Sequence, residues 1–565
     1  MGATLRHVTA PLHQAESTGV FKRDAARSLL CLSALCLTVL LLSTRGIRNE
    51  ATGSLQGDMP RYLMNGAYFF DVLRDLPLTH PIEYTYRYYA KYPALSLGHH
   101  PLLLGVAEVP FYAVFGMSVF SGRLTILCFM LVAVVVWFRL IEQIYDRETA
   151  FFSALLLATT PVLVEYSRIV MAEMSALAMV IVAAYCVHRY SETLRRRDAL
   201  LFAVATAASV YAKHHCVFML PIFLTYVALR RGLSCLFSRD MLLVAVIVVL
   251  LLAPLIPMTL EFSRMNVTWV EAAGRSSRFL LSNLLYYPSA LWRHLVTVPV
   301  LILGAVAFVI SVARRDRRVL LFTLWIVGFY CELTYMAVHE IRFALYWIPP
   351  FCLLAASSLA HTRGLRWKAA VMTVLVLIVG YQTVQSAQMG PEYADGYEEA
   401  AQYVLTHRKG ESVLFSGKVD SGFFAFFVRK HDADRSMVVL RADKTLVTSS
   451  LSRIIATQLT TPEQIYAMLH DFGTGYVVLE DMPYDSPPLE LLRQEMKTER
   501  FALRKRIPLQ SNSEELRGVD LVVYEYLDYT PAERDRLLQM RIPLMGGNIA
   551  VRFGDLLPEK SGKRP

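Results

Sequence analysis

The sequence predicts a polytopic α-helical membrane protein that ends in a soluble α/β domain. Of its 565 residues, 55% are hydrophobic and only 18% are charged, which is too apolar for a water-soluble globule of this size. Apolar runs recur as far as residue 386, and the composition beyond about residue 390 is that of a soluble domain. Arginines gather in the short loops between the apolar runs, as they do in membrane proteins.

Eleven apolar runs are long enough to cross a bilayer, which requires about 20 residues per helix. They lie near residues 28–44, 121–138, 149–165, 169–187, 198–212, 215–229, 241–260, 295–313, 319–338, 343–360 and 369–385. A twelfth run, 101–117, contains two prolines, two glycines and Glu108. We expect this run to be an interfacial or re-entrant helix, although it is long enough to span.

The arginines favour that interpretation of residues 101–117. If this run does not cross, the basic loops all lie on one side of the membrane, which the positive-inside tendency makes the cytoplasm. These loops are 139–148, 188–197, 230–240, 314–318 and 361–368. The first outer loop, 45–120, then faces outward together with the C-terminal domain. If 101–117 crossed, Asp58 would be separated from the other polar groups considered below.

The two ends of the chain are expected to differ. Residues 1–27 are polar, end in basic residues and precede an apolar run without a small-residue cleavage site, so we expect a cytoplasmic tail and a retained first span rather than a cleaved signal peptide. The membrane domain covers 28–386 and the extracytoplasmic α/β domain 387–565. With a net charge of +10, the surplus is interpreted as loop arginine, so a nucleic-acid partner is not expected.

The C-terminal domain alternates short β-rich runs with helical stretches. The β-rich runs are 412–417, 437–442, 476–481 and 521–527, which favours a small α/β domain with a largely parallel sheet. A helix is predicted from the capping pattern at Thr461 to Gly473. The sequence has no GxGxxG, no P-loop and no CxxC or Cys/His zinc spacing, so no nucleotide or metal site is predicted.

Candidate site residues gather at the predicted outer face. Asp58 follows the first span, with Arg61 and Tyr62 one helical turn behind it. The other candidates are Glu173 after Arg168, the turn Lys213-His214-His215, the group His339, Glu340 and Arg342, and the pair His99-His100. Each has a simpler interpretation as a solvated or snorkelling boundary residue, or, for Glu173, as a first-turn glutamate favoured by the helix dipole. Ionisable groups at a membrane boundary are nevertheless more often functional than those on soluble surfaces.

Four segments in this order resemble the GT-C membrane glycosyltransferases, and within them the protein O-mannosyltransferase and aminoarabinose-transferase group (glycosyltransferase 39-like). They are YPALSLGHHPLLLGVAEVPFYAVFG with the acidic residue before it, SALLLATTPVLVEYSRIVMAEMSAL, YAKHH, and HEIRFALYWIPP. The resemblance covers residues 28 to about 385. This sequence departs from the family's pattern at two places. It has His100-Pro101 where the family usually has Pro-Pro, and it has Glu173 where the family usually has Asp.

The resemblance implies an inverting transfer of a sugar from a polyprenyl-phosphate donor to an acceptor hydroxyl of a protein, lipid or polysaccharide. Asp58 would be the general base, Lys213 and Arg342 would neutralise the departing phosphate, and Glu173 would orient the acceptor or a cation. No cofactor is firmly implied, although a divalent cation is compatible. The expected location is the plasma (inner) membrane, with the site on the extracytoplasmic side.

Two other classes of function stay open. A transporter or flippase of lipid-linked sugars would also need outward charges, but it should show repeated halves and charges deep inside spans. Glu332 is the one deep carboxylate of the sequence. A membrane-anchored sensor that works through its C-terminal domain would not need eleven spans.

Overall fold

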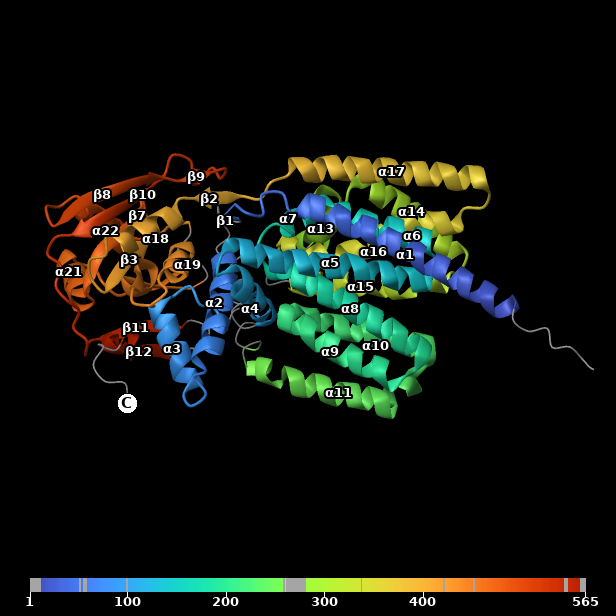
Figure 1. Ribbon diagram of the computed structural model, residues 1–565, viewed down its shortest axis with the longest axis horizontal. Coiled ribbons are helices and arrows are strands. Elements are labelled where there is room, and N and C mark those ends of the chain that lie inside the picture. Colours follow the sequence, from blue (N-terminus) through green and yellow to red (C-terminus); the bar gives the residue numbers. More distant parts are fainter. Residues whose placement is uncertain are drawn as a thin grey trace, which may run out of the picture.

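The computed structural model describes residues 12–49, 52–53, 58–97, 100–257, 260, 281–336, 338–419, 422–450, 453–542 and 547–558. It consists of a helical bundle and a C-terminal domain that sits on one end of that bundle, as Figure 1 shows. Three helices of the first half of the chain lie between these two bodies. They are α2 (Met59–Asp75), α3 (Pro81–Lys91) and α4 (Leu103–Phe115).

Each of the eleven predicted spans coincides over most of its length with a helix of the bundle. The bundle helices are α1 (Leu12–Ser43), α5 (Val119–Ile144), α6 (Arg147–Thr159), α8 (Ala172–Thr193), α9 (Arg196–Ala212), α10 (Met219–Arg231), α11 (Arg239–Leu252), α14 (Val298–Ala313), α15 (Leu320–Met336), α16 (Ile348–His361) and α17 (Leu365–Gln388). Within the described residues, six segments are long and apolar enough to cross a membrane by themselves, and the shorter helices run beside them. The chain is therefore a polytopic membrane protein.

Local sequence explains where several of these helices begin and end. The side chains of Ser118, Asp146 and Ser238 cap α5, α6 and α11 by accepting the N–H of the residue three positions later. Pro161 separates α6 from the short helix α7 (Pro161–Tyr166), because proline removes a backbone donor and clashes with the preceding turn.

The predicted arrangement of loops agrees with the structure. The loops after α5, α8, α10, α14 and α16 lie at the end of the bundle away from the C-terminal domain, where α1 also begins (Figure 1). The thirteen residues of α4 span only about 20 Å, less than the roughly 30 Å of a hydrocarbon core. Helix α4 packs against α2 and α5 at the other end of the bundle. Residues 103–115 therefore do not cross the bundle, and Asp58 stays at the same end as the other candidate residues.

The central sheet of the C-terminal domain has the strand order β4-β3-β7-β10-β8. Its strands are β3 (Ser412–Ser416), β4 (Val438–Arg441), β7 (Thr474–Glu480), β8 (Phe501–Pro508) and β10 (Asp520–Tyr526), and its helices include α18 (Tyr397–Thr406), α19 (Phe423–His431), α21 (Pro462–Asp471) and α22 (Pro487–Glu495). The Thr461–Gln464 capping box of α21 is formed as predicted.

The expectation of a largely parallel sheet is wrong. Only β4, β3 and β7 are parallel, whereas β10 pairs antiparallel with both β7 and β8. Of the five strands of this central sheet, β8 is the one that was not predicted. Its sequence, FALRKRIP, is largely exposed. A charged edge strand lacks the apolar signal of a buried one.

Smaller strand pairs join distant segments. Strand β1 (Thr52–Gly53) of the first outer loop pairs with β2 (Tyr393–Asp395), which pairs with β9 (Gln510–Ser511). The C-terminal domain also has the pairs β5 (Val447–Ser450) with β6 (Arg453–Thr457), and β11 (Leu537–Ile542) with β12 (Gly547–Arg552). The three-stranded sheet ties the first outer loop to the C-terminal domain.

Candidate active site

Asp58 stands at the start of α2, directly before Met59-Pro60. Its carbonyl accepts the backbone N–H groups of Arg61 and Tyr62, which begins the first helical turn. Proline at the second helical position favours this start, because the N–H it lacks has no partner in the first turn of a helix. The residue is only 8% exposed, so its carboxylate is held away from bulk water.

Three cationic or polar groups from distant segments surround that carboxylate. The guanidinium of Arg342 donates to Asp58 Oδ2 at 2.6 Å, and Arg61 donates to Oδ1 at 3.1 Å. The His100 Nε2 lies 3.5 Å from Oδ1. Arg342 belongs to the short helix η6 (Ile341–Trp347) that precedes α16. The fold therefore joins two charged residues that are 284 positions apart.

These contacts determine the protonation of Asp58. Burial alone would raise the pKa of its carboxyl, but the His100 ring and the charges of Arg342 and Arg61 outweigh burial and hold the pKa well below its usual range. Asp58 is consequently ionised throughout the neutral range of pH. A carboxylate with such a low pKa can accept a proton only from a group that becomes strongly acidic during a reaction.

Glu173 and Lys213 form a second buried pair. Glu173 is in the first turn of α8, Lys213 follows the last residue of α9, and Lys213 Nζ lies 2.6 Å from Glu173 Oε1. Glu173 is 1% exposed and Lys213 9%. A buried ion pair of this geometry is costly to break, because the remaining charge stays desolvated.

The ring of Phe343 connects the two pairs. Lys213 Nζ lies 4.3 Å from the ring centroid, and the Arg342 guanidinium carbon lies 5.5 Å from it. The edge of the same ring meets His215, which also packs against Tyr346 at 5.2 Å. Two cations, each paired with a carboxylate, thus lie against one aromatic side chain. Phe343 and Tyr346 are not among the residues predicted from the sequence, although Phe343 directly follows Arg342 and Tyr346 lies one helical turn after it.

The other candidate residues are distributed around this centre. Tyr62 packs on His100 with ring centroids 4.4 Å apart. The Glu340 carboxylate lies 3.7 Å from Arg342 Nε. His339 stacks flat on Tyr286 at 4.1 Å, and its ring contacts the amide oxygen of Asn283 at 2.9 Å. His214 is buried in the short helix η1 (His214–Phe218).

Two candidates are not part of the cluster as described. The Arg168 guanidinium donates to the backbone carbonyls of Leu42, Ser386 and Met389, so it joins α1, α7 and α17 and does not contact the two ion pairs. His99 lies outside the residues that the structure describes.

A cavity of about 760 Å³ opens beside Arg342. Its walls come from α7, α17, η6 and the π-helical turn η4 (Leu291–Leu295), and they include Glu165, Tyr166, Trp292, Arg293, Glu340 and Tyr381. The mixture of aromatic rings, carboxylates and cations provides hydrogen-bond partners and stacking surfaces for a polar ligand.

Within the described part of the chain, no three His, Cys, Asp or Glu side chains are grouped so that they could hold a metal ion. The carboxylates of Asp58 and Glu173 are each engaged by a cationic side chain. A divalent cation at this site would have to displace one of those contacts.

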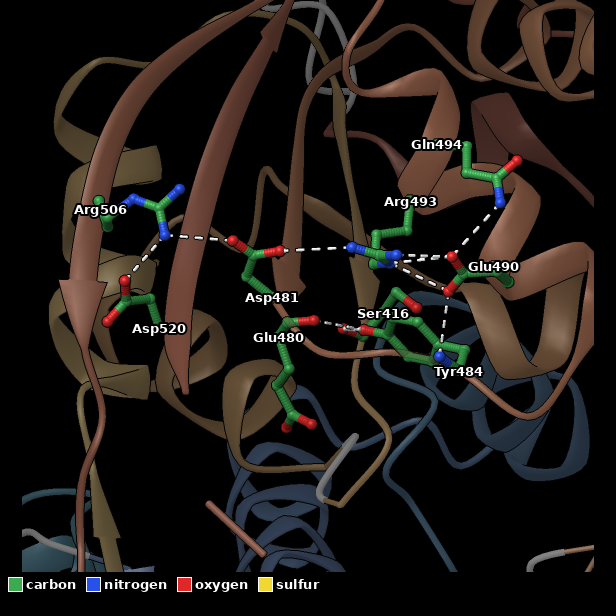
Figure 2. A network of polar contacts seen from close by, with 9 residues as sticks. All are labelled: Ser416, Glu480, Asp481, Tyr484, Glu490, Arg493, Gln494, Arg506 and Asp520. Carbon is green, nitrogen blue, oxygen red and sulfur yellow. Dashed lines mark hydrogen bonds and ion pairs between the residues drawn. The ribbon is translucent and has the colours of Figure 1, made fainter. Parts of the chain in front are cut away.

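The carboxyl ends of β3 and β7 form the switch point of the C-terminal sheet, where α/β domains commonly bind ligands. In this chain the Glu480 carboxylate accepts the backbone N–H groups of Lys418 and Val419 and the hydroxyl of Tyr397. Figure 2 shows the Tyr484 hydroxyl bonded to the main chain of Ser416 and Glu480 beside it. A side chain of the protein thus occupies the position that an anionic ligand takes in other domains.

Comparison with known proteins agrees with this architecture. Residues 99–257 match the family described as Dolichyl-phosphate-mannose-protein mannosyltransferase. The crystal structure of ArnT from Cupriavidus metallidurans in the apo state is similar, with a TM-score of 0.58 and 12% identity over 89% of this chain and 98% of that one. The fold is that of the GT-C membrane glycosyltransferases.

Two further GT-C structures support the same assignment of fold. ArnT from the same organism bound to undecaprenyl phosphate gives a TM-score of 0.56 and 12% identity over 88% of this chain and 97% of that one. The apo oligosaccharyltransferase of Archaeoglobus fulgidus gives 0.50 and 11% identity over 80% of this chain and 69% of that one. A search of curated protein sequences finds no match.

Proposed function

We propose that this chain is an inverting glycosyltransferase that moves a sugar from a polyprenyl-phosphate donor to an acceptor hydroxyl. The observation that carries the proposal is the contact between Arg342 and Asp58, supported by the Glu173–Lys213 pair across Phe343. The four charges supply what the reaction requires, a base for the acceptor and cations for the leaving phosphate. The mannosyltransferase match and the GT-C fold support the same class of reaction.

Arg342 and Lys213 are the proposed phosphate-binding groups. The planar guanidinium of Arg342 can donate two parallel hydrogen bonds to a phosphate, and this side chain lines the 760 Å³ cavity. Without donor, both cations are paired with carboxylates. A donor phosphate that takes over these cations would release Asp58 and Glu173 toward the acceptor.

Asp58 is the proposed base and Glu173 the group that orients the acceptor. The acceptor oxygen forms its bond to the anomeric carbon while the bond from that carbon to the phosphate oxygen breaks, and Asp58 receives the hydroxyl proton. The electron pair of the broken bond leaves on the phosphate, whose charge Arg342 and Lys213 stabilise. Arg61, Tyr62 and His100 hold Asp58 in place.

The proposal also assigns each segment of the chain to a domain and to a side of the membrane. Residues 1–27 would be a cytoplasmic tail, 28–386 the transferase domain and 387–565 an extracytoplasmic domain, with the acceptor a protein, lipid or polysaccharide. Any role of a divalent cation is tested by transfer assays with and without EDTA.

The experiment is incubation of the purified chain in nanodiscs with radiolabelled polyprenyl-phosphate sugars and candidate acceptors. A transferase releases polyprenyl phosphate and forms an equal amount of acceptor glycoside with the opposite anomeric configuration. A transporter or flippase moves the intact donor across vesicle membranes. Donor that crosses the membrane with its sugar-phosphate bond intact would contradict the proposed function.

A further inference from the structure

A second cavity lies at the opposite end of the bundle, far from Asp58. Its volume is about 650 Å³, and it is bounded by the ends of α8, α10 and α14 and the start of α15. Its charged residues are Glu192, Arg230, Arg231, Arg315, Asp316 and Arg317. None of these residues takes part in the proposed transfer.

The carboxylates of this cavity are already neutralised. Glu192 accepts Arg230 at 2.5 Å, and Asp316 forms a two-pronged pair with Arg318, which stacks on the Tyr145 ring at 4.5 Å. Arg231 donates to the backbone carbonyls of Ser191 and Glu192.

Two further guanidiniums, those of Arg315 and Arg317, line the same cavity. Within the described residues, the side chains of Arg315 and Arg317 form no hydrogen bond or ion pair. In the part of the chain that the structure describes, Arg315 and Arg317 thus add two positive charges to this cavity that are not paired with a carboxylate.

The dipole of α14 favours a cation at Arg315, which directly follows the C-cap residue of that helix, but helix dipoles do not account for Arg317. A cation is favoured at a helix C-terminus, which suits Arg231 in the last turn of α10. Arg317 instead lies in the turn η5 (Arg317–Val319) that leads into the N-terminus of α15, the end that repels cations.

The backbone at Arg315 is also unusual. The N–H of Asp316 bonds to the carbonyl of Ser311 and the N–H of Arg315 to that of Val312, the pattern of a Schellman helix end. Arg315 has φ +53° at the position where glycine is preferred. The chain thus keeps a long cationic side chain where its backbone would favour glycine.

The apolar wall determines the kind of ligand. Leu229 and Val312 line the cavity and are 61% and 56% exposed, so in a membrane they face acyl chains. A ligand that fits has an anionic head for the guanidiniums and a hydrocarbon body for the wall. Basic cavities between membrane helices bind lipid headgroups in this manner.

We infer that this cavity binds the phosphate headgroup of an anionic membrane phospholipid, with Arg315 and Arg317 as its principal contacts. The site is separate from the proposed donor site at Arg342, and it requires a lipid that carries net negative charge. Phosphatidylcholine has the same phosphate but no net charge, so it should bind more weakly.

The test measures lipid retention by native mass spectrometry of the purified full chain, titrated with phosphatidylglycerol or phosphatidylcholine. The double variant Arg315→Gln/Arg317→Gln should lose about thirtyfold in affinity for phosphatidylglycerol, since each basic contact contributes about fivefold. The matched control Arg363→Gln/Arg366→Gln removes two exposed arginines at the same end, one just before α17 and one in its first turn, and it should change affinity less than twofold.

The variant Arg315→Gly distinguishes a loss of lipid binding from a loss of folding. Glycine suits the left-handed backbone, so this variant should unfold at a higher temperature than the parent and still lose phosphatidylglycerol. Equal loss in the test and control doubles, equal retention of the two lipids, or full retention by Arg315→Gly would overturn the inference. Displacement of the lipid by millimolar inorganic phosphate would identify a free-phosphate site instead and would also overturn it.

Discussion

Arg342 joins the two halves of the candidate site, and its planar shape matters as much as its charge. Arg342→Lys keeps the charge but loses the fork that can hold a phosphate through two hydrogen bonds. We expect a rise of roughly tenfold or more in the donor Michaelis constant, which corresponds to about 1.4 kcal/mol. Steady-state kinetics with a varied polyprenyl-phosphate sugar measure this effect. Unchanged kinetics would remove Arg342 from the phosphate site.

The acid limb of the pH profile reports on Asp58. Its pKa in the folded protein is depressed by His100, Arg342 and Arg61 against the effect of burial, so the carboxylate is present above that pKa and is lost only as the pH falls through it. We expect kcat/KM to show no loss from Asp58 protonation between pH 7 and 5. Arg61→Gln removes one of the cations and should move the acid limb to higher pH. An acid limb that is unmoved by Arg61→Gln would show that another group titrates there.

That these residue types gather at one end of the bundle could be predicted from sequence, but their pairing could not. Asp58 and Arg342 are 284 positions apart, and nothing local to either residue indicates the contact. Lys213 was assigned to the phosphate alone, whereas the fold places it on Glu173. Tertiary packing around Phe343 decides these contacts.

At the scale of elements, α2 connects the candidate active site to the C-terminal domain. It begins at Asp58 and carries Asp71, whose carboxylate accepts Arg429 of α19 through two hydrogen bonds and the Tyr88 hydroxyl at 2.8 Å. Asp71 is 0% and Arg429 4% exposed. A second pair, Arg435 with Asp75, follows at the end of the helix.

Removing one partner of the Asp71–Arg429 pair should destabilise the protein. Asp71→Asn leaves a buried arginine without its counter-charge, which costs about 3–5 kcal/mol. Asp71→Leu combined with Arg429→Met removes both charges and should recover most of that stability. Thermal unfolding in detergent measures both variants. An Asp71→Asn protein as stable as the parent would show that the pair does not hold the two bodies together.

Helices and strands with long apolar runs were predicted correctly from the sequence, whereas a strand with few apolar residues was not. Each span has a long, predominantly apolar run, and β3 and β7 are buried along their whole length. Strand β8 escaped prediction because its exposed Arg504-Lys505-Arg506 segment carries no apolar signal. In Figure 2, Arg506 is paired with Asp520 of the adjacent strand β10 and with Asp481, which directly follows β7, contacts that only the sheet reveals.

For the whole molecule, the arrangement of loops predicts which surfaces share a side of the membrane. In a cysteine-free background, Thr79→Cys and Thr498→Cys lie at the end that carries the C-terminal domain, and Arg363→Cys lies at the other end. All three positions are exposed. We expect a membrane-impermeant maleimide to label the first two in intact cells and the third only after permeabilisation. The reverse pattern would place the proposed site in the cytoplasm.

The central claim is that Asp58 is the base of a glycosyl transfer from lipid phosphate, and Asp58→Asn tests it most directly. The amide is nearly isosteric but cannot take the acceptor proton. Transfer of a radiolabelled sugar from polyprenyl phosphate should therefore fall by about a hundred- to ten-thousandfold. Donor binding should persist, and Glu173→Gln should be milder. A well-folded Asp58→Asn protein that transfers sugar at a near-normal rate would contradict the account and assign the base to Glu173.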